Sequence, residues 1–275
     1  MPRLDLASQT VVITGASSGI GVAFARALAA RGANVALVAR RRARLDELAA
    51  ALREEHGVTT SAIPLDLSEP SASDDLRAAL SDAGVTPTSL INNAGFGTFG
   101  PFVGEDPQRL AQMIAVDVSA PVRLSRAFLP DVVAARGFLI NVASMAAYTP
   151  TPRMAVYGAA KAFTLSFTES LWAETRHTGA TVFALSPGAT STEFNAVVGT
   201  EDATAGAAMR TPDQVVATAM AHLESRRPGP GVVDGAANRV GATLSRLMSR
   251  RLAATMMHRV TDPARRATSG AGAQG

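Results

Sequence analysis

The sequence predicts an α/β fold, in which a doubly wound parallel sheet of about seven strands carries helices on both faces. Two observations support this class. Short runs rich in β-branched and aliphatic residues alternate with longer segments of helical spacing, and a Gly- and Ser-rich loop directly follows the first run. Repeated strand–helix units form a parallel sheet, which binds its ligands at the carboxyl ends of the strands.

The elements alternate along most of the chain. Strands are expected at 10–13, 34–39, 61–63, 90–92, 138–142, 181–185 and 232–233. Helices are expected at 20–31, 40–56, 70–83, 106–134, 154–177 and 211–224. Gly32, Gly57 and Gly84 stand where three of these helices should end. We therefore predict one domain over residues 1–238.

The C-terminal region has a different composition. Residues 239–260 are expected to form one basic amphipathic helix, followed by a disordered tail over 261–275. Two interpretations of this helix stay open. Its apolar face packs on the body or on a second subunit, or it borders the substrate cleft and its arginines attract an anionic group. That group would belong to a carrier-bound or coenzyme-bound acyl chain or to an anionic lipid. The apolar face holds Val240, Leu244, Leu247, Met248 and Leu252, and the other face holds Arg239, Arg246 and Arg250.

Composition excludes several classes of protein. Hydrophobic residues make up 47% of the 275 residues, so a folded core is expected. The absence of cysteine excludes disulfide scaffolds, thiolate metal sites and cysteine nucleophiles, and four scattered histidines predict no metal site. Residues 225–275 carry a net charge of +7, but the remainder carries −4, which argues against a nucleic-acid-binding body. With no apolar run of ~18 residues and no leader-type apolar core, we expect a cytoplasmic protein.

The loop after the first strand reads Thr14-Gly15-Ala16-Ser17-Ser18-Gly19-Ile20-Gly21. Glycine permits a tight turn and a close approach of backbone to ligand. The free N–H groups and the positive dipole end of the next helix attract a phosphate. The loop is typical of a dinucleotide site, although ordinary strand–helix turns share this composition.

The second strand ends without the acidic residue that commonly holds the ribose hydroxyls in such sites. It is followed instead by Arg40, Arg41 and Arg42. A guanidinium binds a phosphate bidentately, whereas a carboxylate would repel it. We therefore predict NADP(H) rather than NAD(H), with Arg40 and Arg41 at the 2′-phosphate. The other interpretation, a solvated helix start, is the one we take for Arg42.

Tyr157 and Lys161 are four residues apart and share one face of the long helix expected at 154–177. A phenol with a pKa of ~10 is a poor base at neutral pH, and a nearby ammonium lowers that pKa. Lys161 is the only lysine in a chain with 26 basic residues. Its compact ammonium on a flexible stem serves both the phenol and a ribose hydroxyl, which the wide fork of arginine does not.

These motifs, in their order and spacing, resemble the short-chain dehydrogenase/reductase family over residues 8–235. The resemblance also includes Asp66, Asn92-Asn93-Ala94-Gly95, Ser144 and Pro187-Gly188. It implies a single-domain Rossmann-like fold of the NADP-preferring branch, assembled as a homodimer or homotetramer. The implied activity is hydride transfer between NADP(H) and a carbonyl or secondary alcohol, which we expect to be a lipophilic small molecule.

The resemblance also implies residue roles. Tyr157 would donate or accept the proton, Lys161 would depress the pKa of Tyr157 and bind the nicotinamide ribose, and Ser144 would orient the substrate oxygen. The cofactor would further contact Gly15, Ser17, Ser18, Gly19, Ile20, Gly21, Asp66, Leu67, Asn93, Ala94, Gly95, Pro187, Gly188 and Thr192.

One residue departs from the family's pattern. The family usually has an asparagine on the helix after Asn-Asn-Ala-Gly, where its backbone helps to hold a proton-relay water, and this chain has Asp117. A backbone role survives the change, but an ionised side chain cannot donate a hydrogen bond and adds a charge near Lys161. A low-turnover cofactor-binding regulator therefore stays open as an alternative function. A protein of the membrane surface also stays open, on the basic C-terminal helix alone.

Overall fold

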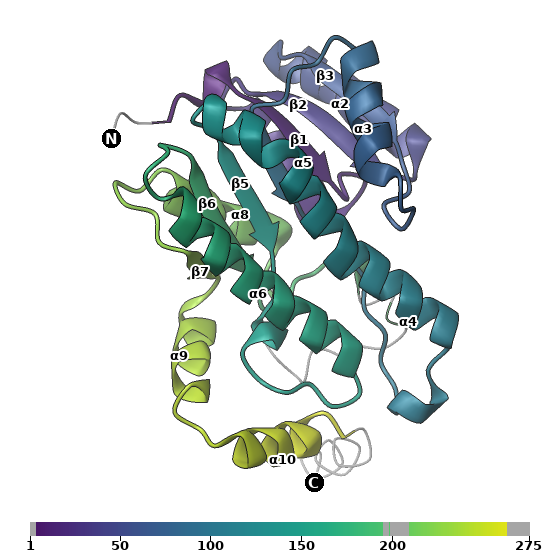
Figure 1. The fold of residues 1–275 in the computed structure, drawn as a ribbon, viewed down its shortest axis with the longest axis vertical. Helices are drawn as coiled ribbons and strands as arrows, with labels where there is room; N and C mark the ends of the chain where they lie inside the picture. The colour runs from purple at the N-terminus through teal and green to yellow at the C-terminus, as the bar shows by residue number, and fades with distance from the viewer. Residues whose placement is uncertain (1–3, 195–197, 199–208, 263–275) are drawn as a thin grey trace, which may run out of the picture.

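The computed structural model describes residues 4–194, 198 and 209–262. Its centre is a seven-stranded sheet in the order β3-β2-β1-β4-β5-β6-β7, and every strand pair is parallel (Figure 1). The order reverses between β1 and β4, and this switch point is where such sheets bind their ligands. The predicted fold class is therefore confirmed.

The expected elements are present with small shifts at their ends. The strands are β1 Thr10–Thr14, β2 Asn34–Ala39, β3 Thr60–Pro64, β4 Ser89–Asn92, β5 Phe138–Val142, β6 Thr181–Ser186 and β7 Gly231–Val233. The helices of the body are α1 Gly19–Ala29, α2 Arg42–His56, α3 Ala72–Asp82, α4 Pro107–Ile114, α5 Ala120–Ala134, α6 Ala155–Thr175 and α8 Pro212–Leu223.

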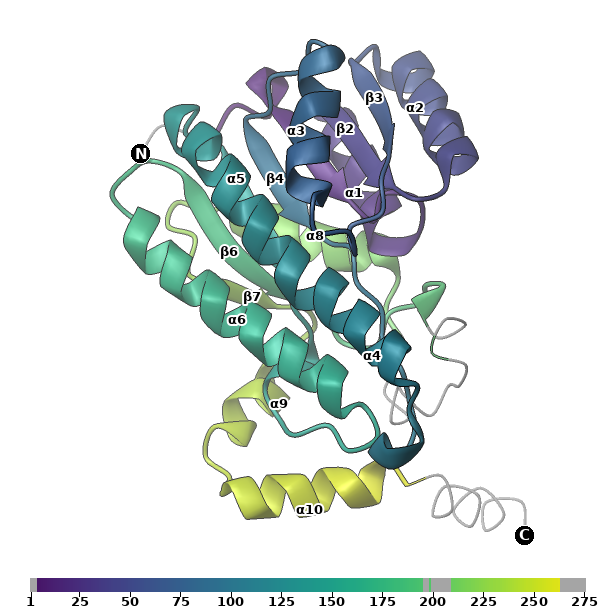
Figure 2. The same cartoon turned by 45° about the vertical axis from the view of Figure 1, so that its right-hand side comes forward.

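Alternating strand residues supply two separate cores. Val11 and Ile13 of β1 face a cluster formed with α1, α2 and α8, whereas Val12 between them faces a cluster formed with α3, α5 and α6. Both faces of the sheet are thus buried, as the continuous apolar character of the strands requires. Figure 2 shows α5 and α6 lying side by side across one of these faces.

The helical segment expected at 106–134 is one unbroken helix with an irregular turn in its middle. Residues Ala115–Ser119 between α4 and α5 form a π-helical turn. Pro121, directly after the π turn, and Pro130, inside α5, have no N–H to donate to the carbonyls of the preceding turn. A π turn inside an α-helix often marks a functional site, and this one contains Asp117.

The prediction of a single C-terminal helix over residues 239–260 is wrong. The structure has two helices, α9 Ala236–Ser245 and α10 Arg250–Val260, which project beyond the body (Figure 2). The break arises at Ser249, whose hydroxyl accepts a hydrogen bond from the Leu252 N–H and so caps a new helix. The predicted tail lies almost entirely outside the described residues. Among the residues that the structure describes, no helix is both long and apolar enough to cross a bilayer.

Candidate active site

The parallel sheet gathers the candidate residues at the carboxyl edge of its strands. The glycine loop follows β1, Asn93 to Gly95 follow β4, Ser144 follows β5, and Pro187 follows β6. Tyr157 lies in the first turn of α6, and Lys161 lies one turn further on. The side chains that sequence reasoning selected are therefore brought to one edge by the topology alone.

Lys161 is held by a buried ion pair. Its Nζ lies 3.3 Å from Asp117 Oδ2 and donates a hydrogen bond of 3.2 Å to the Val142 carbonyl. The Asp117 side chain is 0% exposed and the Lys161 side chain 7% exposed. The Phe96 N–H donates a hydrogen bond of 3.0 Å to Asp117 Oδ1, whereas Oδ2 accepts no hydrogen bond of good geometry. The second charge predicted near Lys161 is therefore present, in direct contact.

The backbone around this pair is shaped to admit it. The π turn places Asp117 on the helix side that faces α6, where Thr164 donates a hydrogen bond of 3.4 Å to the Asp117 carbonyl. A Cβ at Gly95 would stand 3.0 Å from both Asp117 Oδ2 and Lys161 Nζ. Glycine at this position lets the loop after β4 pass directly over the ion pair.

Burial and charge act against each other in this pair. Burial raises the pKa of Asp117, and the neighbouring Lys161 ammonium lowers it only in part. For Lys161, burial lowers the pKa, but the charges of Asp117 and Tyr157 raise it overall. Lys161 is therefore held in its protonated form at neutral pH.

Tyr157 lies beside this pair, with Lys161 Nζ 5.6 Å from the centre of its ring. Burial raises the pKa of the Tyr157 phenol. Lys161 and a hydrogen bond with Ser144 lower that pKa, as the sequence predicted for Lys161, but burial and the charge of Asp117 outweigh them. Lys161 therefore acts on the phenol in the predicted direction, but the net shift of the Tyr157 pKa is upward, chiefly because of burial and to a smaller extent because of the charge of Asp117.

The start of α1 fits a bound phosphate. Its N-cap residue, Ser18, makes no side-chain capping hydrogen bond, so the first N–H groups of the helix are left for an anion. Gly19 has φ +54°, and a Cβ there would meet Thr192 at 2.8 Å. The loop can approach the segment after β6 only because this residue is glycine.

Arginines flank this loop on the side of β2. Arg41 donates hydrogen bonds to the Ser17 hydroxyl at 3.0 and 3.1 Å and to the Ser17 carbonyl at 3.2 Å. It also pairs with Glu193 at 2.7 Å, and Arg44 pairs with the same carboxylate at 2.5 Å. These bonds lower the pKa of Glu193 to about 2.

Arg40 lies close enough to Asp66, in the loop after β3, for its charge to act on that carboxylate. The pKa of Asp66 is lowered overall. Partial burial acts to raise it, but hydrogen bonds from the Ser68 N–H and hydroxyl and the charge of Arg40 lower it by more. Leu67, expected to meet the adenine, is buried in the core beneath the sheet edge.

The remaining predicted residues build the walls of the site. Asn93 donates hydrogen bonds from Nδ2 to the carbonyls of Thr14 at 2.9 Å and Gly15 at 3.4 Å, and so joins the loops after β1 and β4. The Pro187 carbonyl accepts a hydrogen bond of 2.8 Å from the Met145 N–H, which lies directly after Ser144. A Cβ at Gly188 would collide with Asn238 of α9. The loop after β4 continues from Asn93 through Ala94 and Gly95. Helix α1 continues from Gly19 through Ile20 and Gly21, and Thr192 packs against Gly19.

Sequence reasoning missed two residues of the site, Glu193 and Phe194. The Phe194 ring lies 5.3 Å from the Tyr157 ring at an angle of 51°, and with Met154 it surrounds Gly97. Neither residue belongs to a motif, and both reach partners more than 30 residues away in the chain. No local sequence pattern could have identified them.

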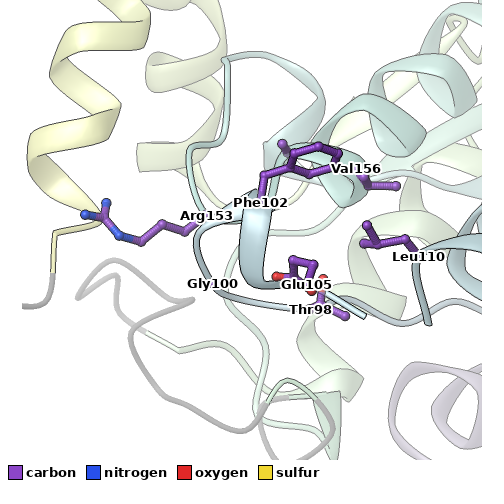
Figure 3. Close-up of a pocket in the computed structure, with 8 residues that line it drawn as sticks. Thr98, Gly100, Phe102, Glu105, Leu110, Arg153 and Val156 are labelled. Atoms are coloured by element: carbon purple, nitrogen blue, oxygen red, sulfur yellow. The ribbon is translucent and has the colours of Figure 1, made fainter. Parts of the chain in front are cut away.

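A shallow depression lies beside the site rather than in it. Figure 3 shows it between the loop that carries Thr98 and Gly100, the side chain of Leu110 on α4, and Val156 on α6. Neither Ser144 nor Tyr157 lines it. We therefore locate the chemistry at the sheet edge and treat the depression as part of the outer surface.

Comparison with known proteins identifies the family. The model of the short chain dehydrogenase family matches residues 9–203. This chain belongs to that family. A short chain dehydrogenase of Pseudocercospora fijiensis is 37% identical over 81% of this chain and 69% of its own length. The predictions of family and of an oxidoreductase of this family are therefore confirmed.

Two further relatives bear on the chemistry. A very-long-chain 3-oxoacyl-CoA reductase of Anas platyrhynchos is 33% identical over 68% of this chain and 61% of its own length. The solved short-chain dehydrogenase from Sphingobium yanoikuyae, in complex with NADPH, is 34% identical with a TM-score of 0.76, covering 87% of this chain and 94% of that one. Among the curated relatives, the chain spans between 48% and 79% of the relative's length.

Proposed function

We propose that this protein is an NADP(H)-dependent oxidoreductase that interconverts a carbonyl compound and a secondary alcohol. One observation supports the proposal above all: Ser144, Tyr157 and Lys161 lie together at the carboxyl edge of the sheet. They lie beside the glycine-rich loop after β1, which can bind a phosphate. An acid, a hydrogen-bond donor and a fixed cation at one edge form the set that carbonyl reduction requires.

The choice of cofactor rests on charge. Arg40 and Arg41 follow β2 where a carboxylate would select a free ribose hydroxyl, and the structure places the Arg41 guanidinium on Ser17 of the phosphate loop. The NADPH complex of the Sphingobium yanoikuyae relative supports the same choice. Bound NADPH supplies the hydride, and the protein supplies orientation and charge.

The proton comes from Tyr157. Because burial raises the pKa of its phenol, Tyr157 is protonated at neutral pH and is ready to act as the acid when a carbonyl is reduced. Ser144, hydrogen-bonded to Tyr157, orients the same carbonyl oxygen. Lys161 stabilises the phenolate that forms when the proton leaves, since its ammonium lowers the pKa of Tyr157.

Asp117 acts through Lys161. Its carboxylate fixes the ammonium at 3.3 Å, and the Val142 carbonyl fixes it from a second direction. Asp117 is therefore a positioning residue in our proposal. The backbone carbonyl that the family uses for a relay water lies 3.4 Å from the Thr164 hydroxyl, whose closer acceptor is the Ala160 carbonyl at 3.0 Å.

A lipophilic substrate is supported by the residues around Tyr157. Phe194 packs on the ring of Tyr157, and the Met154 thioether methyl lies with both rings around Gly97. Aromatic and thioether side chains form an adaptable apolar wall. The Anas platyrhynchos relative is a reductase of very-long-chain 3-oxoacyl-CoA, which is also lipophilic.

A second candidate function is a cofactor-binding regulator with little turnover. The observation that favours it is the direct contact of Asp117 with Lys161, which reduces the effect of the ammonium on Tyr157. Purified protein is mixed with NADPH and a panel of long-chain and bulky ketones and aldehydes, and NADPH absorbance is followed. We expect the absorbance to fall with at least one ketone. Tight NADPH binding without oxidation across the whole panel would support the regulator instead.

Assembly and compartment stay predictions. A homodimer or homotetramer is measured by light scattering of the purified chain, and a cytoplasmic location by fractionation of cells that express it.

A further inference from the structure

The two C-terminal helices turn their large apolar side chains outward. Leu244 is 55% exposed, Leu247 82%, Leu252 56% and Met256 42%. The buried residues of these helices are instead small: Ala242 in α9 and Ala253 in α10. A helix that packs on its own domain does the opposite, burying its large residues and exposing its polar ones. The apolar face therefore does not pack on the body, and of that interpretation only packing on a second subunit stays a prediction.

The two C-terminal helices carry charge of one sign. Residues 236–260 contain five arginines and neither Asp nor Glu, and all five arginines are exposed. On α10, Arg259 lies seven residues after Leu252 and so on the same side as Leu252 and Met256, and Arg251 lies next to Leu252 in the chain. An exposed apolar stripe flanked by arginine is the pattern of a helix that lies in the interface of an anionic membrane.

This surface is tied to the start of the catalytic helix. Arg153, four residues before Tyr157, donates hydrogen bonds to the His258 carbonyl at 3.4 Å and to the Thr261 hydroxyl at 3.3 Å, and pairs with Asp262 at 3.3 Å. Figure 3 shows the Arg153 side chain extending from the depression towards the C-terminal helix.

A second exposed apolar segment, the turn Phe102–Gly104, follows a residue that is hydrogen-bonded to Arg153. The Arg153 carbonyl accepts a hydrogen bond of 2.9 Å from the Gly100 N–H. The 3₁₀ turn Phe102–Gly104 follows at once, with Phe102 62% exposed and Val103 96% exposed. Exposed apolar side chains from two distant parts of the chain thus belong to one hydrogen-bonded region beside α6.

We propose that α9, α10 and the turn Phe102–Gly104 form a docking surface for an anionic lipid bilayer. Charge selects this occupant. A second copy seated on the same surface would bring five arginines against five arginines, and residues 263–275 offer two more arginines and no apolar side chain larger than proline. A bilayer with anionic headgroups satisfies the arginines and the apolar stripe together.

Docking would present the site to substrate in the membrane. This part rests on the proposed function, because it requires a lipophilic carbonyl substrate at Tyr157. The bilayer would lie against the segment that leads into α6, where Arg153 stands four residues before Tyr157. The docking itself requires no turnover and is tested without it.

The test is flotation of the full-length protein with vesicles of phosphatidylcholine alone and of phosphatidylcholine mixed with phosphatidylglycerol. We expect binding to the mixed vesicles only, weakening as salt rises because the attraction is screened within ~8 Å at physiological salt. The double variant Leu252→Ser/Met256→Ser should lose at least ~10-fold in affinity, since two half-exposed apolar side chains no longer insert.

A matched pair of variants separates this surface from overall charge. Arg251→Ala/Arg259→Ala should weaken binding by about 10-fold or more, at ~1 kcal/mol for each arginine near an anionic surface. Arg226→Ala/Arg227→Ala removes the same charge from exposed positions before β7 and should leave binding within about twofold. All variants should keep the parent's thermal midpoint, since every altered side chain is exposed.

The proposal fails if the parent does not bind the mixed vesicles, or if both arginine pairs weaken binding equally. It also fails if light scattering shows an oligomer that Leu252→Ser/Met256→Ser converts to a smaller species, which would assign the surface to contact between copies. The Tyr157→Phe variant should bind vesicles as the parent does. Loss of activity with retained docking therefore tells the two proposals apart.

Discussion

Two clusters of carboxylate and cation lie at the same edge of the sheet and differ in their exposure. At the nucleotide end, Glu193 bridges Arg41 and Arg44, and all three side chains are between 42% and 49% exposed. At the catalytic end, Asp117 holds Lys161 with exposed fractions of 0% and 7%. The chemical groups are alike, but only the first cluster can exchange its partners with solvent and with a ligand.

Exposure decides what each cluster can do. An exposed pair is worth ~0–1 kcal/mol, so a phosphate can displace Glu193 from its arginines at small cost. A buried pair loses far more when one partner is removed, because the other charge is left unpaired in a medium of low dielectric. We conclude that the nucleotide end is built for exchange and the catalytic end for a fixed charge.

The largest expected effect comes from breaking the buried pair. Lys161→Met leaves Asp117 alone, and we expect a loss of about 3 kcal/mol in the free energy of unfolding at neutral pH. The pKa of Asp117, already raised by burial, rises further without Lys161. The folded state then binds a proton more tightly than the unfolded state, so the variant's stability falls as pH rises through that pKa. The loss relative to the parent should therefore be smallest in acid, measured by urea unfolding between about pH 4, near the ordinary pKa of an aspartic acid, and about pH 8.

The double variant Lys161→Met/Asp117→Asn is the control for this prediction. It removes both charges and should recover part of the lost stability. If it is no more stable than Lys161→Met alone, the loss does not arise from an unpaired carboxylate.

A smaller effect is expected at the nucleotide end. Arg41→Ala should weaken NADPH binding by about 10- to 150-fold, the equivalent of one charge-assisted hydrogen bond of ~1.5–3 kcal/mol, and leave NADH binding within about twofold. Arg40→Asp should reverse the preference between the two cofactors. Fluorescence titration of both cofactors measures this.

Arg42→Ala serves as the matched control, because Arg42 is exposed and pairs with Asp46 on its own helix at 3.4 Å. It should change neither affinity. An equal loss of NADPH and NADH affinity in Arg41→Ala would show that Arg41 supports the loop and not the 2′-phosphate.

The smallest effect is expected from Glu193→Gln. Removing the carboxylate that competes for Arg41 and Arg44 should tighten NADPH binding by about two- to fivefold, as expected for an exposed pair. With a pKa of about 2, Glu193 is ionised throughout the neutral and mildly alkaline range, where the 2′-phosphate also keeps both charges because its second pKa is about 6, so the gain should not vary between about pH 7 and about pH 9. The gain should shrink as salt rises. The control is Glu224→Gln, which alters an exposed pair with Arg31 far from the site and should leave NADPH binding unchanged. If Glu193→Gln instead binds NADPH more weakly, Glu193 does not compete with the 2′-phosphate for the arginines.

The sequence predicted what local pattern determines. Apolar runs and glycine stops defined the seven strands, and parallel topology then placed Tyr157, Lys161 and Ser144 at one edge. It failed where a single polar residue changed the outcome, as at Ser249, whose cap divides the C-terminal helix. Periodicity also could not show that the large apolar side chains of α9 and α10 point to solvent, since an apolar stripe has the same spacing whether it is buried or exposed.

The site was predicted less fully than the fold because its electrostatics depend on distant contacts. The upward pKa of Tyr157 follows from burial and from Asp117, which lies 40 positions earlier in the chain. Glu193 and Phe194 reach their partners only after the chain has folded. Motif spacing identifies the reacting groups, but it does not give the pKa values of these groups, which depend on burial and on neighbouring charges.

The most direct measurement compares Tyr157→Phe with the parent in two assays, NADPH binding by titration and NADPH oxidation with a ketone that the parent reduces. The substitution keeps the ring that packs on Phe194 and removes only the proton. We predict a dissociation constant within about twofold of the parent and turnover lower by at least ~100-fold, the loss expected for a general acid. Turnover within a few-fold of the parent, with binding intact, would contradict the assignment of Tyr157 as the acid.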